Sequence, residues 1–246
     1  MRPALQHKAE GAPPRLAAVR AAIIGCDACP RLRRHCLTVA REKKAAHRDE
    51  TYWGRPVPGF GDPEARLLLV GLAPAAHGAN RTGRVFTGDG SGDFLAAALH
   101  ATGFANLPTS RRADDGLRLR DAYILAAVRC APPANKPTPA EIARCLPHMA
   151  AEIAALPRVK VVVALGKIGH DAYLAHAAAA HGVRPRPRPL FGHGHEVRLG
   201  GGLPVLLGCY HPSRQNTNTG KLTAPMMRAV FERARALIAR EEENHG

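Results

Sequence analysis

Four short apolar runs stand out along the chain, separated by longer stretches in which apolar and polar residues mix. A continuous apolar run of roughly four to eight residues is typical of a strand buried on both faces, as in a parallel sheet. The runs are Leu67–Gly71, Tyr123–Val128, Val159–Leu165 and Pro204–Gly208. They predict the strands of a buried parallel sheet.

Helical patterns lie between these runs and after the last of them. Thr138 and Glu141 form a capping box with proline at the first helical position, and Pro147 predicts a kink in the helix that follows. Strands that alternate with helices predict an α/β fold in one domain spanning residues 1–246. The other predicted helices are Ser91–Ala101, Ile168–His181 and Ala224–Glu242.

Three further segments lie outside this alternation. Residues 1–60 are expected to form an added N-terminal layer, with a helix near Ala17–Ile24 and a charged stretch over Arg41–Glu50. Arg184–Pro189 alternates arginine with proline, which predicts an extended basic loop. His195–Leu199 and the last apolar run flank three glycines, which suggests a hairpin.

Polar, glycine-rich or proline-rich loops follow three of the four apolar runs. They are Gly71–Asp89, Val128–Pro139 and Cys209–Asn216. The first is much longer than the usual strand-to-helix loop of about 2–6 residues. Because the carboxyl ends of parallel strands share one edge of a sheet, we expect the three loops to converge on one pocket.

The charge of the chain is unusual for a globular protein of 246 residues. Thirty-five Lys and Arg face 20 Asp and Glu, which gives a net charge of +15, and 28 of the 35 basic residues are arginine. Arginine pairs well with phosphate, so the balance favours a nucleic-acid partner. The alternative is a GC-rich genome that uses arginine where others use lysine.

No targeting or membrane segment is visible. The first 15 residues are polar and proline-rich, without the apolar core of a signal peptide. The chain has no run of about 18 apolar residues that would span a membrane. We therefore expect a cytoplasmic protein that does not bind membranes, and we expect a monomer.

Four residues in the three loops are candidates for chemistry on a planar base. Phe86 lies in a polar loop, where it can stack on a base or pack as an ordinary core residue. Asp89 can act in the site or merely cap the helix that follows. Asn135 offers a donor and an acceptor to a base edge, or forms a turn before Lys-Pro. His211, at the end of a strand, can donate to an oxygen that gains charge.

Five polar residues of the same loops are candidate contacts to a DNA backbone. Each can bind a phosphate or lie on the solvated surface. They are Arg81, Arg84, Lys136, Ser213 and Arg214.

The cysteines suggest a metal site. Cys26 and Cys29 form a CxxC pair, and Cys130 and Cys145 come from a distant segment. Four thiolates in two such segments can bind zinc or an iron–sulfur cluster, and their spacing does not choose between these. The alternative is that CxxC occurs by chance. Cys36 and Cys209 are interpreted as small apolar residues.

In these loops and the segments next to them, the chain resembles the family-5 (type b) uracil-DNA glycosylases of the uracil-DNA glycosylase superfamily. The resemblance implies a three-layer fold with a central four-stranded parallel sheet flanked by helices. It also implies a [4Fe-4S] cluster on Cys26, Cys29, Cys130 and Cys145. The segments that carry it are Tyr52–Pro63, Gly71–Asp89, Val128–Pro139 and Tyr210–Gly220.

One departure from the wider superfamily affects the mechanism. Most relatives have an acidic or amide side chain in the first loop, where this chain has Leu72 and Ala73. Neither can orient water, and family 5 is similar in this respect. Asp89 is the nearest acidic candidate, so the catalytic set we expect is Asp89, Asn135 and His211. The expected base-binding set is Gly71, Ala73, Ala75, Phe86 and Asn135.

The resemblance implies a monofunctional DNA glycosylase that hydrolyses the N-glycosidic bond of uracil in DNA, and leaves an abasic site for base excision repair. Ala73 and Ala75 leave room for a purine such as hypoxanthine. The partner is therefore DNA that contains uracil or other deaminated bases. Two alternatives remain, a non-catalytic nucleic-acid-binding iron–sulfur protein and a zinc-stabilised hydrolase of another nucleotide-type substrate.

Overall fold

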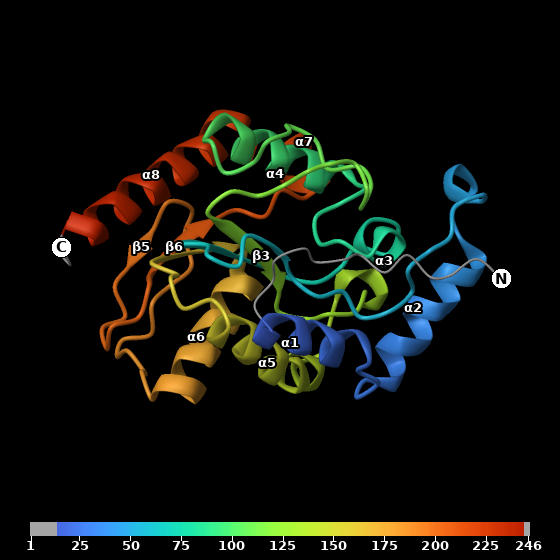
Figure 1. Ribbon diagram of the computed structural model, residues 1–246, viewed down its shortest axis with the longest axis horizontal. Coiled ribbons are helices and arrows are strands. Elements are labelled where there is room, and N and C mark those ends of the chain that lie inside the picture. The colour runs from blue at the N-terminus through green and yellow to red at the C-terminus, as the bar shows by residue number, and fades with distance from the viewer. Residues whose placement is uncertain (1–13, 244–246) are drawn as a thin grey trace.

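The structure, a computed structural model, describes residues 14–243 and has a sheet between two groups of helices (Figure 1). The strand order is β1-β3-β2-β4-β6-β5. The four central strands are parallel and every residue in them is buried, as expected for the apolar runs. These strands are β2 (Leu67–Gly71), β3 (Ala122–Ala126), β4 (Val161–Leu165) and β6 (Val205–Cys209).

The sheet has two more strands than predicted. Strands β1 (Phe60–Gly61) and β5 (Glu196–Val197) add antiparallel edges next to β3 and β6. A sheet of only four strands was therefore wrong as a count, although the parallel centre is confirmed. Strand β1 has only two residues and no periodic pattern, so the sequence does not show it. Strand β5 lies within His195–Leu199, the segment predicted as one arm of a hairpin. The predicted hairpin is confirmed, because Glu196 pairs with Leu207 of β6.

Helices cover both faces of the sheet and make it three-layered (Figure 1). On one face, α8 packs on β4 and β6 and against α4, and on the other α6 packs on β2 and β4 and against α5, which also contacts α1. Each face has its own core of buried side chains. The bounds are α1 (Pro14–Ile24), α4 (Gly90–Ala101), α5 (Pro139–Ala154), α6 (Lys167–His181) and α8 (Ala224–Glu243).

The capping box at the start of α5 is confirmed. Thr138 Oγ1 accepts a hydrogen bond from the Glu141 amide at 3.2 Å, and the Glu141 carboxylate accepts one from the Thr138 amide at 2.8 Å. The helix continues through Pro147 to Ala154. None of the helices within residues 14–243 has the length and apolar character needed to cross a membrane.

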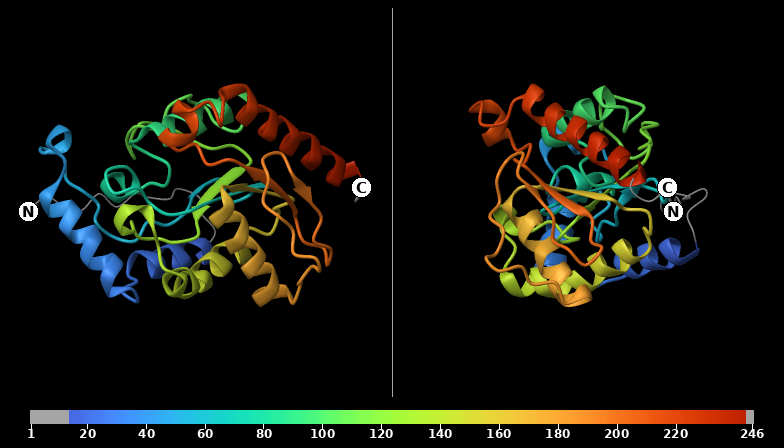
Figure 2. Two further views of the ribbon diagram at one scale, coloured as in Figure 1. Left: turned by 180° about the vertical axis from the view of Figure 1, so that it is seen from behind. Right: turned by 90° about the vertical axis from the view of Figure 1, so that its left-hand side faces the viewer.

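The N-terminal layer contains a helix that the sequence did not predict, α2 (Pro30–Glu42). It lies at the end of the molecule opposite the carboxyl end of α8, as both views show (Figures 1 and 2). Its buried side is small, consisting of Leu32 and Cys36. The remaining short helices are η1 (Ala45–His47), α3 (Ala79–Thr82), η2 (Pro133–Asn135) and α7 (Arg214–Asn218).

Candidate active site

The three polar loops meet at one cavity beyond the carboxyl ends of the central strands, as predicted. Its volume is about 540 Å³, within the range of pockets that hold small organic groups. Ser91 and Gln215 also line it, and the sequence interpretation missed both. The cavity brings together eight of the predicted residues, namely Ala73, Ala75, Phe86, Asp89, Asn135, His211, Ser213 and Arg214.

Phe86 is held in a strained backbone conformation at this cavity. Its φ is +48°, which a bulky residue rarely adopts. A side chain at Gly71 would place its Cβ 2.7 Å from the Phe86 ring, so the glycine lets the ring lie against the end of β2. The ring also packs against the core and faces the His211 ring, with centroids 5.7 Å apart. Gly71 therefore supports the ring from behind and is absent from the cavity lining.

Asp89 caps helix α4 and also lines the cavity. One carboxylate oxygen accepts a hydrogen bond from the Gly92 amide at 2.9 Å. The other lies against Gly78, where a Cβ would collide with it. Burial raises the pKa of Asp89 above its ordinary value. The two interpretations of this residue are thus compatible, because the capping carboxylate is also at the cavity wall.

His211 lines the cavity at the end of β6. Its side chain packs against the backbone of Gly166, where an added Cβ would be 3.2 Å away. Its main-chain oxygen accepts hydrogen bonds from the Ser213 amide and the Asn216 side chain, both at 2.8 Å. Burial lowers its pKa to about 4. The imidazole is therefore neutral near pH 7 and donates from only one nitrogen.

Asn135 lies at the exposed mouth of the cavity, in the left-handed conformation with a φ of +56°. Asparagine tolerates this conformation better than most residues. The next residue, Lys136, is exposed, and its main-chain oxygen accepts a hydrogen bond from Arg31 at 3.3 Å. Arg31 also makes a two-pronged ion pair with Glu141, at 2.7 and 2.8 Å. This pair ties the Asn135 loop to α2.

Arg81 and Arg84 are not available to phosphate, which contradicts our expectation for both. The Arg81 guanidinium contacts Glu50 and donates to the main-chain oxygens of His77 and Gly88 at 2.8 and 2.9 Å. Arg84 donates to both Asp115 oxygens at 2.8 and 2.9 Å. Both side chains are buried. Arg81 supplies donors to main-chain oxygens of the glycine-rich loop, whereas Arg84 pairs with a carboxylate from a distant segment.

The cysteine region is compact, although its thiols are not arranged as a metal site. Cys29, Cys130 and Cys145 lie in one buried cluster, which also contains Cys36. Cys26 is partly exposed. Within residues 14–243 no group of three or more His, Cys, Asp or Glu residues is placed to hold a metal ion. The chemistry of the set still suits a soft metal, because all four donors are thiols and the Arg129 amide donates to Cys145 Sγ at 3.4 Å.

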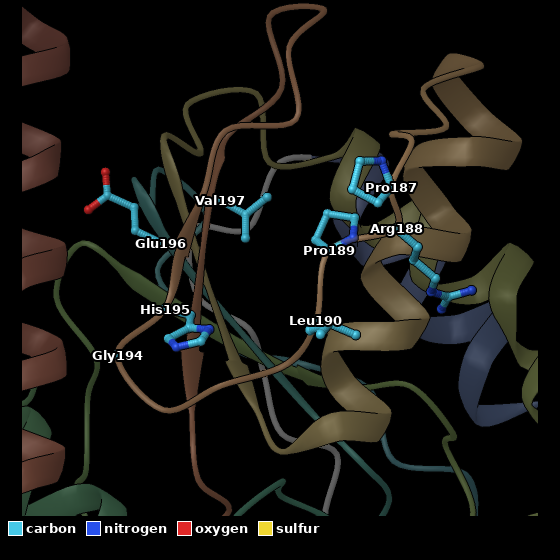
Figure 3. A pocket seen from close by; sticks show the side chains of 8 residues that line it. All are labelled: Pro187, Arg188, Pro189, Leu190, Gly194, His195, Glu196 and Val197. Atoms are coloured by element: carbon cyan, nitrogen blue, oxygen red, sulfur yellow. The ribbon is translucent and has the colours of Figure 1, made fainter.

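A second hollow lies beside the edge strand β5 and has a larger volume, about 760 Å³ (Figure 3). Its walls include Pro187, Pro189 and Leu190, and it contains no residue of the three loops. The Arg188 side chain points toward α6, where it pairs with Asp171 at 3.0 Å. Few polar groups converge there, so the strand-end cavity is the better candidate site.

A cavity beyond the carboxyl ends of parallel strands is the position at which open α/β proteins bind their ligands. The chain belongs to the uracil-DNA glycosylase superfamily, whose family model matches residues 58–235. It is 52% identical over 215 residues to the type-5 uracil-DNA glycosylase of Thermus thermophilus, covering 87% of this chain and 94% of that protein. The type-5 enzyme of Mycobacterium tuberculosis is 50% identical over 224 residues, 91% of this chain and 82% of its own. The type-5 uracil-DNA glycosylase of Pyrobaculum aerophilum is 42% identical over 214 residues, which cover 87% of this chain and 89% of that protein.

Proposed function

We propose that this protein is a monofunctional DNA glycosylase that removes uracil from DNA and leaves an abasic site. The observation that carries the proposal is the strand-end cavity, where Phe86, Asp89, Asn135 and His211 come together from three loops. Membership of the uracil-DNA glycosylase superfamily and the similarity to type-5 uracil-DNA glycosylases support it. We further propose that it acts as a cytoplasmic monomer in base excision repair.

The target base must leave the duplex stack to reach the cavity, at a cost of about a few kcal/mol. Phe86 would stack on the extruded base, since its ring faces the cavity and is held in place by the Gly71 contact. Asn135 would read the base edge from the cavity mouth. Ala73 and Ala75 add no polar groups and leave room for a larger deaminated base such as hypoxanthine.

Bond cleavage leaves negative charge on the departing base and positive charge on the sugar. A neutral His211 would donate a hydrogen bond to a base oxygen as that charge develops, together with main-chain amides of the Gly71–Ala75 loop. One donor of this kind contributes about 2.7–4 kcal/mol. Asp89 would hold the attacking water, because its carboxylate lies at the cavity wall and is fixed by the Gly92 amide.

With Arg81 and Arg84 excluded, three residues remain as candidate contacts to the DNA backbone. They are Lys136, Ser213 and Arg214. Lys136 is exposed beside Asn135, and Ser213 and Arg214 line the cavity. They would fix the register of the DNA so that the target nucleotide faces Phe86.

We propose that Cys26, Cys29, Cys130 and Cys145 hold a [4Fe-4S] cluster. The thiol donor set and the shared burial of the last three support it. The cluster would supply a covalent link between the N-terminal segment and the loop that carries Asn135. Iron and sulfide analysis, with Cys26→Ser/Cys29→Ser as the comparison, tests this assignment; a colourless protein that binds zinc would contradict it.

The alternative function is a non-catalytic DNA-binding protein, favoured by Leu72 and Ala73, which cannot orient water. Single-turnover base release from uracil-containing duplexes decides between the two. We expect release by the wild type, reduced about 10²- to 10⁴-fold in Asp89→Asn. Because burial raises the pKa of Asp89, release by the wild type should decline with falling pH sooner than for an ordinary aspartate.

Release that survives Asp89→Asn would keep the glycosylase and remove Asp89 from the mechanism. Tight DNA binding with no release from uracil or hypoxanthine would instead favour the binding protein.

A further inference from the structure

Helix α2 has an exposed face with a strong positive charge that the proposed site does not use. Arg34 and Arg41 are exposed on it, two helical turns apart, and exposed Lys44 follows its carboxyl end. At 1.5 Å per residue the two arginines are about 10 Å apart along the axis. Glu42 is the only acidic residue of the helix.

The cations on this face are not committed to internal contacts. Within residues 14–243 the Arg34 side chain has no hydrogen-bond or ion-pair partner. Arg41 lies 3.6 Å from Glu42, with both side chains largely exposed, and an exposed pair of this kind contributes little. Arg33, on another side of the helix, donates to the main-chain oxygen of Gly54 instead.

Both ends of α2 are connected to loops of the candidate site. At its start, Arg31 donates to the main-chain oxygen of Lys136, beside Asn135. After its end, the Lys44 amide donates to the Tyr52 hydroxyl at 3.3 Å, and that hydroxyl lies 3.1 Å from His77 Nδ1 in the first loop. The helix that carries the charged face is therefore anchored at both ends to loops of the candidate site.

We propose that this face of α2, carrying Arg34, Arg41 and Lys44, is a second DNA-contacting surface that binds the phosphate backbone of the duplex flanking the target nucleotide. The inference rests on the proposed function, because the partner is the same DNA. Duplex DNA carries one negative charge per about 1.7 Å of axis, so a basic face of this length spans several phosphates.

The test compares two double variants that each remove two positive charges. Arg34→Gln/Arg41→Gln changes the α2 face. Arg158→Gln/Arg240→Gln is the matched control, with Arg158 before β4, at the amino ends of the strands, and Arg240 near the end of α8. Arg158 has a weak exposed partner, Glu64 at 3.8 Å, much as Arg41 has Glu42. Melting temperatures of both variants check that the fold is intact.

Affinity for a duplex is measured by anisotropy between 50 and 200 mM salt. Each lost phosphate contact makes the slope of log affinity against log salt shallower by about 0.9, so the α2 variant should have a slope shallower by about 2. The ratio of wild-type to variant affinity should therefore be about tenfold larger at 50 mM than at 200 mM salt. The control variant should match the wild type.

Duplex length separates a local contact from a general effect of charge. Shortening one flank, tested separately on each side by about one helical turn (roughly 10 base pairs), should abolish the difference between wild type and the α2 variant on one side only. The proposal would be overturned if the wild type and the α2 variant had the same slope of log affinity against log salt. It would also be overturned if the α2 variant lost the same affinity on every duplex and the control variant lost as much.

Base release by the wild type in the same preparation keeps the two claims apart. If uracil is not released but the length-dependent effect of the α2 variant is present, the proposed glycosylase activity is contradicted and the proposed DNA contact of α2 is supported. If uracil is released and the α2 variant binds like the wild type, the surface is wrong and the glycosylase stands.

Discussion

The arginines of the first loop and those of helix α2 have the same side chain and opposite environments. Arg81 and Arg84 are buried and bound to carboxylates and main-chain oxygens of their own chain. Arg34 and Arg41 are exposed on a helix that has one acidic residue. The net charge of +15 counts both kinds alike. A basic composition therefore indicates a polyanionic partner without showing which arginines meet it.

The difference has a physical origin in the backbone around each arginine. A helix such as α2 satisfies most of its own main-chain groups, so Arg34 and Arg41 on its exposed face are left for solvent or a partner. The first loop has little regular structure, and Arg81 satisfies the carbonyls of His77 and Gly88 that would otherwise be orphaned. In that loop arginine holds the shape that places Phe86 and Asp89.

The largest expected effect is on stability, from removal of a buried arginine. Arg84→Met leaves the Asp115 carboxylate without its 2.8 and 2.9 Å partners, which should cost about 3–5 kcal/mol of unfolding free energy, nearer the lower figure because Asp115 is partly exposed. Urea unfolding measures this. Arg111→Met, an exposed neighbour in the same segment, is the control and should change little.

The double variant Arg84→Met/Asp115→Asn should recover part of the loss, because no unpaired charge remains. A wild-type stability for Arg84→Met, together with a reduced salt slope for DNA binding, would show that Arg84 meets phosphate after all.

An intermediate effect on stability is expected at the ion pair between Arg31 of α2 and the buried Glu141 carboxylate. The hydrogen bonds from Arg31 lower the pKa of Glu141 to about 2. A depressed pKa in the folded state adds stability above the unfolded value of about 4.3, and that stability is lost as the pH falls toward 2. Glu141→Gln should therefore be less stable than the wild type by about 1–2 kcal/mol at pH 7, since Arg31 is half exposed.

The gap between wild type and Glu141→Gln should close between about pH 4 and pH 2 in urea unfolding. Glu42→Gln is the control, because that exposed carboxylate lies 3.6 Å from Arg41. A gap that stays constant with pH would mean that Glu141 acts only as the uncharged acceptor of the capping box.

The sequence predicted the parts of this molecule that follow local patterns. The four central strands are continuous apolar runs, and the convergence of their loops follows from parallel strand direction. The capping box of α5 is a four-residue pattern. The position of Asp89 just before α4 indicates a helix cap, and the structure confirms the cap.

Contacts between distant segments were not predictable. Arg84 pairs with Asp115, 31 residues away, and nothing near either residue marks the pair. Helix α2 was missed because its buried side has only Leu32 and Cys36 among charged residues. The Phe86 ring lies against Gly71, a contact that the sequence does not show, and neither does the sequence show the left-handed backbone of Phe86.

The smallest expected effect is on the stability of an Arg34→Gln variant. Arg34 is exposed, and its side chain has no partner within residues 14–243, so the unfolding free energy should stay within about 0.5 kcal/mol of the wild type. Urea unfolding of this single variant beside Arg84→Met measures the contrast directly. A loss above about 1 kcal/mol would mean that Arg34 supports the packing of α2. Weaker DNA binding by its variants would then reflect a displaced helix, and only a loss of affinity without a loss of stability assigns the charge to DNA.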